Sequence, residues 1–258
     1  MRYQIALVTL LFSLSVNAET ANWNYVRTPR GSDLEIKITR SFKADAPLII
    51  VAPGQSCNSK GLLFETIEQD AIKREINIVR FEWSYCSPSS TNRNPSDDLS
   101  SEVNDMDFAI NYSKELLQKT NRDLFVLGKS LGSMITYLVF KNHPDLKSVT
   151  LLTPVCSYAT DEQGKPLPSP KEATNENYPD LLLETRPILM ISGNSDPLCD
   201  HTILKSFKEK SQDNLDVIYT KGDHGYRVFN SDGSVNQNES QDNLVNVSSD
   251  MLNWFAAH

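Results

Sequence analysis

A serine stands between two glycines in the sequence Gly128-Lys-Ser130-Leu-Gly132, and of the ten glycines only these two lie four residues apart around a serine. An apolar run at residues 124–127 precedes it and an apolar helical pattern follows, so the serine is expected in a strand-to-helix turn. Such a turn directs the hydroxyl away from the sheet, and its glycines let strand and helix approach closely. The pattern predicts that Ser130 is a nucleophile; the alternative interpretation is an ordinary turn whose serine caps the helix.

Two further residues follow predicted strands and could activate this hydroxyl. Asp196 stands in the turn after the apolar run 187–192, and His224 follows the run 215–220. A serine hydroxyl is a poor nucleophile until an imidazole accepts its proton, and the imidazole needs a carboxylate that fixes its tautomer. The chain order Ser130, Asp196, His224 therefore predicts a nucleophile, an acid and a base.

Each partner also has a plainer interpretation. Asp196 could be a solvated turn residue. Asp200 is a rival acid, although its position before a predicted helix suits a capping role better. The other three histidines lie at predicted helix ends or at the chain terminus: His143, His201 and His258. Only His224 is expected in a polar loop just past a strand, and its place after Ser130 and Asp196 favours the catalytic interpretation.

Acyl transfer also needs N–H groups that hold the developing oxyanion. The backbone N–H of Leu131 directly follows the predicted nucleophile, at the start of a predicted helix. The second N–H is expected from Gln55, in the sequence Pro53-Gly54-Gln55 after an apolar strand. The alternative is that Gly54 only makes a turn. Lys129 is open to two interpretations, at the pocket edge or in solvent.

Apolar stretches alternate with helical patterns along the chain. Residues 23–40 are expected to form an antiparallel pair at the sheet edge. Strands are expected at residues 34–40, 46–52, 76–82, 124–127, 148–154, 187–192 and 215–220. Helices are expected at residues 61–74, 101–118, 133–140, 178–185, 201–211 and 241–255. Most strands are apolar throughout, which indicates a mostly parallel sheet covered on both faces. Functional residues of such sheets lie beyond the carboxyl ends of the strands, where Ser130, Asp196, His224 and Gln55 are each expected.

Two irregular segments interrupt this alternation. Residues 84–99 are polar and rich in Ser, Asn and Pro, and residues 156–177 contain Lys165-Pro-Leu-Pro-Ser-Pro170. Long loops of this kind shape pockets more often than cores. The second segment is too short for a domain and is expected to be a small flap. We expect the two segments to border the site.

The first 18 residues have the pattern of a signal peptide. Arg2 precedes an apolar run at residues 5–16. Val16 and Ala18 provide the small residues expected at positions −3 and −1 of a cleavage site after Ala18. The run is too short for a comfortable membrane span. The pattern predicts export to the periplasm or secretion; the alternative is an uncleaved amphipathic N-terminus. The remaining 240 residues, 19–258, suit a single domain with a substantial core.

Charge and cysteine content narrow the possible partners. The net charge of −8 becomes −9 when Arg2 leaves with the signal peptide, and no Lys/Arg cluster is present, which argues against a nucleic-acid partner. Four cysteines in an exported chain favour two disulfides, for which three connectivities exist. The rival interpretation, a metal site, lacks support because the chain has no C-x-x-C or H-x-x-x-H spacing.

From about residue 47 to the C-terminus the chain resembles a compact α/β-hydrolase, in style closest to the dienelactone-hydrolase-like enzymes. The resemblance depends on four motifs: Pro53-Gly54-Gln55, Gly128-Lys-Ser-Leu-Gly132, Ile188-Leu-Met-Ile-Ser-Gly-Asn-Ser-Asp196 and Gly222-Asp-His224. It implies an α/β-hydrolase fold, with a mostly parallel central sheet, helices on both faces and no large cap domain. If the strand order follows that fold, neighbouring loops would pair Cys57 with Cys86 and Cys156 with Cys199.

Two departures from that family limit what the resemblance implies. Pro53-Gly54 stands where a His-Gly pair is common, and the nucleophile is Ser130 where true dienelactone hydrolases use cysteine. The substrate is therefore not carried over.

Motifs and resemblance together predict an exported serine hydrolase that cleaves a carboxylic ester, or less favourably a thioester or amide, through an acyl-Ser130 intermediate. The expected partner is a small-molecule acyl substrate. No metal, organic cofactor, nucleic-acid partner or stable membrane insertion is expected, and the oligomeric state is open. Two alternatives stay open, a catalytically silent binding protein of the same fold and a serine peptidase. The complete Ser-His-Asp set favours an enzyme.

Overall fold

A nine-stranded sheet forms the centre of the computed structural model, which describes residues 19–20, 22–161, 163 and 165–258. The predicted signal peptide, residues 1–18, lies outside the described residues. The strand order is β1-β3-β5-β4-β6-β7-β10-β11, with β2 beside β3. The strands of this sheet are β1 (Glu19–Thr20), β2 (Asn24–Arg27), β3 (Asp33–Arg40), β4 (Leu48–Ala52), β5 (Asn77–Glu82), β6 (Leu124–Lys129), β7 (Val149–Leu152), β10 (Ile188–Gly193) and β11 (Leu215–Thr220).

The sheet is parallel from β5 to β11 and antiparallel at the edge that β1, β2 and β3 form. This agrees with the sequence, because all residues of β4, β5, β7 and β10 are buried, whereas β3 alternates buried and half-buried positions. Parallel strands that are covered on both faces need apolar side chains on both faces.

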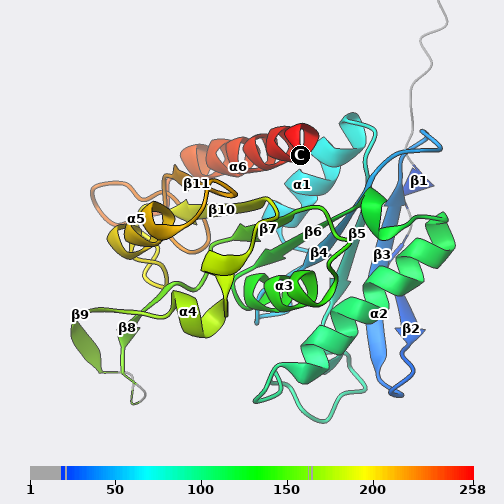
Figure 1. Ribbon diagram of the computed structural model, residues 1–258, viewed down its shortest axis with the longest axis horizontal. Helices are drawn as coiled ribbons and strands as arrows, with labels where there is room; N and C mark the ends of the chain where they lie inside the picture. The colour runs from blue at the N-terminus through cyan, green and yellow to red at the C-terminus, as the bar shows by residue number, and fades with distance from the viewer. Residues whose placement is uncertain (1–18, 21, 162, 164) are drawn as a thin grey trace, which may run out of the picture.

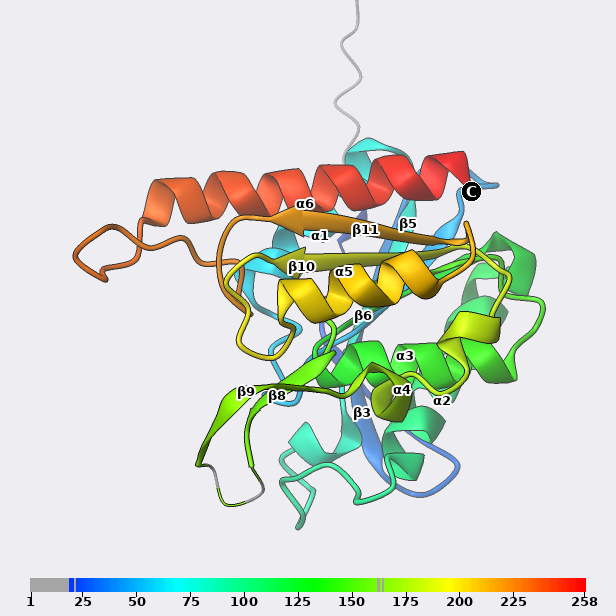
Figure 2. The same ribbon diagram turned by 60° about the vertical axis from the view of Figure 1, so that its left-hand side comes forward.

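Helices cover both faces of the sheet (Figures 1 and 2). The helices are α1 (Leu62–Lys73), α2 (Ser100–Leu117), α3 (Leu131–Asn142), α4 (Thr174–Asn177), α5 (His201–Lys210) and α6 (Gln237–Ala257). Ile49 and Val51 of β4 belong to the core on the side of α1 and α6, whereas Leu48 and Ile50 belong to the core on the side of α2 and α3. Alternate side chains of a strand point to opposite faces, so one apolar strand supplies both cores.

Register decides which loops meet at the carboxyl edge of the sheet. Ala52 of β4 pairs with Gly128 of β6, and Gly193 of β10 pairs with Thr220 of β11. The loop after Ala52 therefore begins level with the turn after β6, and the loops after β10 and β11 begin level with each other.

The irregular segment at residues 156–177 contains an antiparallel hairpin of β8 (Ser157–Thr160) and β9 (Pro166–Glu172), which projects from the body of the molecule (Figure 1). It is a small flap, as expected. The disulfide pairing Cys57–Cys86 and Cys156–Cys199 is confirmed. The second disulfide joins the start of this flap to the loop between β10 and α5.

Two helix predictions need correction. The helix expected at residues 178–185 is wrong: the segment holds only one 3₁₀ turn, Leu181–Leu183, after Asp180 in a left-handed conformation with φ 62°. Pro179 disfavours helical geometry for Tyr178, and the left-handed backbone of Asp180 is not helical either, so no helix begins at Tyr178. The C-terminal helix begins at Gln237, earlier than expected, because the Asn236 side chain caps it by accepting from the N–H of Glu239.

Candidate active site

Ser130 lies in a strained turn between β6 and α3, with φ 55° and ψ −123°. A non-glycine residue at positive φ indicates strain that surrounding packing must hold. The flanking glycines are sterically required here. A Cβ on Gly128 would lie 2.1 Å from the carbonyl oxygen of Gly132, and a Cβ on Gly132 would lie 2.3 Å from that of Pro53. The Gly-x-Ser-x-Gly spacing thus permits the close packing that exposes the Ser130 hydroxyl.

The imidazole of His224 lies between Ser130 and Asp196. Its Nε2 is 2.8 Å from the Ser130 Oγ. Its Nδ1 is 2.8 Å and 3.0 Å from the two carboxylate oxygens of Asp196. The Asp196 side chain is fully buried and also accepts from the N–H of Leu198 at 2.8 Å. A buried carboxylate on Nδ1 fixes the proton there and leaves Nε2 free to accept the hydroxyl proton.

The loops that carry Asp196 and His224 are in direct contact. The N–H of Ser195 donates to the carbonyl of Gly222 at 2.9 Å. A Cβ on Gly193 would lie 2.4 Å from that same carbonyl oxygen, so glycine allows the approach. The acid and the base, which lie 28 residues apart in the chain, are thus held together at one edge of the sheet.

The loop after β4 lies beside Ser130. The Cβ position of Gly54 is 3.5 Å from the Ser130 Cβ. Trp83 Nε1 donates to the Gly54 carbonyl at 3.2 Å, and the Tyr85 hydroxyl donates to the Gln55 carbonyl at 2.8 Å. These two bonds fix the orientation of the peptides around Gln55.

Leu131, the other expected oxyanion donor, is the first residue of α3. The first N–H groups of a helix have no intrahelical partner, and the positive end of the helix dipole favours an anion there. The structure therefore brings both expected donors, Gln55 and Leu131, into the neighbourhood of Ser130.

Lys129 is the residue whose position the sequence left open. Its side chain is half-buried at the cavity wall, and Nζ donates to the backbone carbonyl of His224 at 3.0 Å. Burial lowers the pKa of Lys129 to about 8, although the carboxylates of Asp196 and Asp223 oppose this shift. Of the two interpretations, the position at the pocket edge is the correct one, and the contact to His224 is a further feature that the sequence did not predict.

A cavity of about 690 Å³ opens at Ser130. One wall is apolar and comes from α1 and α6, with Leu62, Leu63, Phe64 and Leu244. The other wall holds polar groups, among them Gln55, Asn58 and Lys129. Cavities of this size accommodate drug-sized molecules.

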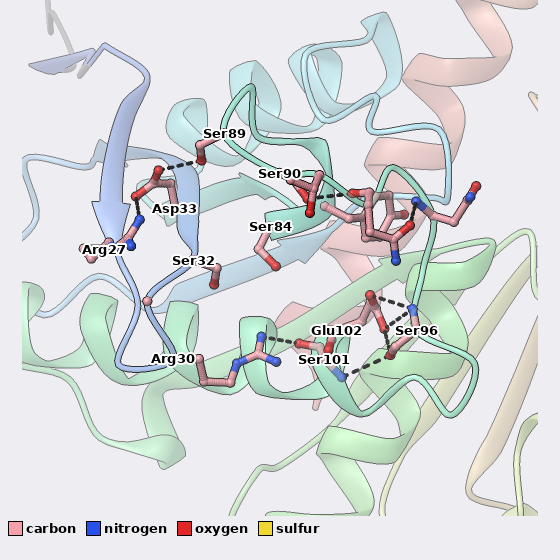
Figure 3. A pocket seen from close by; sticks show the side chains of 15 residues that line it. Arg27, Arg30, Ser32, Asp33, Ser84, Ser89, Ser90, Ser96, Ser101 and Glu102 are labelled. Atoms are coloured by element: carbon pink, nitrogen blue, oxygen red, sulfur yellow. Dashed lines mark hydrogen bonds and ion pairs between the residues drawn. The ribbon is translucent and has the colours of Figure 1, made fainter.

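The expected borders of this cavity are wrong, since none of the described residues of 84–99 and 156–177 lines it. Residues 84–96 instead help to line a separate polar cavity of about 520 Å³, together with the turn around Arg30 and the start of α2 (Figure 3). The loop at residues 84–96 is connected to the segment around Gln55 by the disulfide Cys57–Cys86 and by the Tyr85 hydrogen bond. The loop therefore stabilises the segment around Gln55 without lining the cavity at Ser130.

The competing candidates have structural partners elsewhere. The Asp200 side chain caps α5 by accepting from the N–H groups of Thr202 and Ile203. His143 ends α3 and its Nε2 is 2.8 Å from Asp107. Within the described part of the chain no group of three or more His, Cys, Asp or Glu side chains could hold a metal ion. None of the helices described is both long and apolar enough to span a bilayer.

This chain belongs to the α/β-hydrolase family, because the model of the alpha/beta hydrolase domain matches residues 45–255. The family and the sheet topology confirm the expected fold class, a mostly parallel sheet with helices on both faces and no large cap domain. No curated protein matches the chain at a significant level.

Several solved structures share the fold at low sequence identity. A protein of unknown function from Agrobacterium tumefaciens, described as an α/β-hydrolase, has a TM-score of 0.66 at 14% identity, covering 92% of this chain and 98% of its own. An α/β serine hydrolase homologue from Coxiella burnetii has a TM-score of 0.62 at 16% identity, covering 88% and 97%. Est1E from Butyrivibrio proteoclasticus, solved with ferulic acid bound, has a TM-score of 0.66 at 14% identity, covering 90% and 99%.

Proposed function

We propose that this protein is an exported serine hydrolase that cleaves a carboxylic ester through an acyl-Ser130 intermediate. One observation carries the proposal: a continuous contact from the Ser130 hydroxyl through the His224 imidazole to the buried Asp196 carboxylate. Membership of the α/β-hydrolase family supports hydrolysis as the class of reaction.

In the proposed reaction the Ser130 Oγ attacks the acyl carbonyl while His224 Nε2 takes the hydroxyl proton. The N–H groups of Gln55 and Leu131 would hold the oxyanion of the tetrahedral intermediate. The intermediate collapses, the C–O bond to the alcohol breaks, and the alcohol leaves with the proton from Nε2. Water then attacks the acyl-enzyme while His224 Nε2 takes its proton, and the carboxylic acid is released as that proton passes to the Ser130 Oγ.

The cavity supports an ester with an apolar part. Leu62 lies on the first turn of α1, lines the cavity and is half exposed, so a hydrocarbon portion of the substrate would cover its side chain. The structural neighbour Est1E has ferulic acid bound, and a carboxylic acid with an apolar part is the kind of product that hydrolysis of such an ester would release.

Export and domain organisation belong to the same proposal. Two disulfides support an oxidising location such as the periplasm or the outside of the cell. We take residues 1–18 as the signal peptide and residues 19–258 as one hydrolase domain, since strands from both ends of that range pair into one sheet.

A fluorophosphonate probe and a series of p-nitrophenyl esters test the proposal. The purified protein should be labelled at Ser130 and should hydrolyse at least one ester, whereas Ser130→Ala should do neither. A folded wild-type protein without labelling or turnover would favour the silent binding protein. Cleavage of peptides in preference to every ester would instead favour the peptidase.

A further inference from the structure

Lys129 connects the proposed nucleophile and base by two routes. In the chain it directly precedes Ser130, and in space its Nζ donates to the backbone carbonyl of His224 at 3.0 Å. The Ser130 Oγ and His224 Nε2 are 2.8 Å apart. One side chain thus bridges the strand end that carries the hydroxyl and the loop that carries the imidazole.

The Lys129 ammonium lies among charges from both neighbouring loops. Asp196, from the loop after β10, and Asp223, from the loop after β11, stabilise its charged form, and Arg227 opposes it. Asp223 is itself held by Arg227, whose Nη2 lies 2.6 Å from its Oδ2. The His224 imidazole is the remaining titratable group of the cluster. A hydrogen bond from an ammonium group to a carbonyl is stronger than one from a neutral amine.

We infer that Lys129 is a positioning residue of the proposed reaction, whose ammonium group holds the His224 carbonyl so that the imidazole stays aligned with the Ser130 hydroxyl. This inference rests on the proposed function. Lys129 donates no proton to the substrate and forms no bond with it. It acts by fixing the backbone from which His224 extends, and catalysis is sensitive to small displacements of such groups.

Loss of the charge on Lys129 should weaken this hold. Because the pKa of Lys129 lies at about 8, the ammonium is present at neutral pH and is lost as the pH rises through that value. The neutral amine can still donate an N–H. Turnover of the wild type should therefore fall near pH 8 to a lower plateau and not to zero.

The test compares wild type, Lys129→Met and Lys129→Arg, with the full pH profile of ester hydrolysis for each. Lys129→Met should lower kcat by about 10- to 100-fold at pH 7, with KM within about twofold, and should show no fall near pH 8. Lys129→Arg should restore most of kcat and also lack that fall, because arginine keeps its charge throughout this range.

Lys221→Met is the matched control, since Lys221 belongs to the same loop as His224 but pairs with Glu239 at the surface. It should retain the wild-type profile, and melting temperatures should confirm that all four proteins fold. A fall near pH 8 that persists in Lys129→Met, or an unchanged kcat in that variant, overturns the inference while leaving the hydrolase proposal intact. Absence of turnover in the folded wild type overturns both.

Discussion

Asp196 and Asp200 lie four residues apart in one loop, yet their carboxylates have different partners. Both oxygens of Asp196 lie within 3.0 Å of His224 Nδ1, whereas Asp200 accepts from the first N–H groups of α5. The sequence offers both residues as the candidate acid, and their different contacts in the folded chain distinguish them.

We predict that Asp196→Asn lowers kcat by about 10⁴-fold with little change in the fold, because the amide favours the wrong imidazole tautomer. Asp200→Ala should keep kcat within about twofold and lower the stability by about 1 kcal/mol, as expected when a helix cap is lost. Ester kinetics and thermal melting of both variants check this. If Asp200→Ala lost activity as severely as Asp196→Asn, the assignment of the acid would be wrong.

The orientation of the Gln55 peptide leads to a second prediction. Tyr85→Phe removes the hydroxyl that donates to the Gln55 carbonyl but leaves the ring in place. The Gln55–Ser56 peptide then loses this hydrogen bond, and the neighbouring peptide that carries the Gln55 N–H is held only through the Trp83 bond to the Gly54 carbonyl. We therefore expect kcat to fall by about 5- to 20-fold with KM nearly unchanged. The measurement is steady-state ester hydrolysis.

Tyr137→Phe is the control for that experiment. The Tyr137 hydroxyl donates to the carbonyl of Pro179 at 3.1 Å, and Tyr137 does not line the cavity at Ser130. Each variant loses one hydroxyl that bonds a backbone carbonyl. Equal losses of kcat in both would indicate a general effect on packing and would contradict a specific role for Tyr85.

Local pattern was sufficient to predict the parallel sheet and the residues that converge on Ser130. Apolar strands result from burial, and a glycine-flanked serine results from close backbone approach. Both patterns can be recognised within a few consecutive residues of the sequence. Register then brings the ends of parallel strands to one edge, so residues at those ends converge wherever they lie in the chain.

The cavity walls and the role of Lys129 could not be predicted in the same way. Leu62 and Leu244 come from α1 and α6, near opposite ends of the domain, and only the contact between these two helices makes the leucines a common wall. Lys129 contacts a carbonyl 95 residues later. Neither the periodicity nor the spacing of residues in the sequence indicates which loop will contact a given side chain in the folded protein.

The apolar wall yields a prediction about the substrate. Leu62 lines the cavity and is 53% exposed, so its side chain is available to the hydrocarbon part of an ester. Burial of apolar groups there should raise kcat/KM from p-nitrophenyl acetate to the hexanoate. Leu62→Ser should lower kcat/KM for the hexanoate by about 5- to 10-fold and leave the acetate within about twofold.

Leu183→Ser is the matched control for the wall, since Leu183 is 73% exposed and does not line the cavity. It should leave both esters unchanged. If Leu62→Ser lowered kcat/KM for the acetate and the hexanoate equally, Leu62 would stabilise the site without contacting the acyl chain of the substrate.

Glu82, at the end of β5, leads to a prediction about stability and pH. Its side chain is buried, its Oε1 accepts from the N–H of Ser59 at 2.7 Å, and its Oε2 has no hydrogen-bond partner. Burial raises the pKa of Glu82 to about 7, and the Ser59 N–H and the charge of Lys60 only partly offset it. Folding therefore takes up a proton at this carboxyl between pH 4.5, its ordinary pKa, and about pH 7.

The free energy of unfolding should accordingly decrease as the pH rises through that window, and this contribution should be constant above it. Glu82→Gln keeps the acceptor for Ser59 but carries no charge at any pH. The variant should be close to wild type near pH 4.5 and more stable by roughly 1–3 kcal/mol at pH 8. Urea unfolding of both proteins at several pH values measures the difference, in which the contributions of titrating groups that do not interact with Glu82 cancel. A difference that does not grow between pH 5 and pH 8 would show that Glu82 is charged in the folded protein throughout, and that the polar groups around it solvate the carboxylate fully.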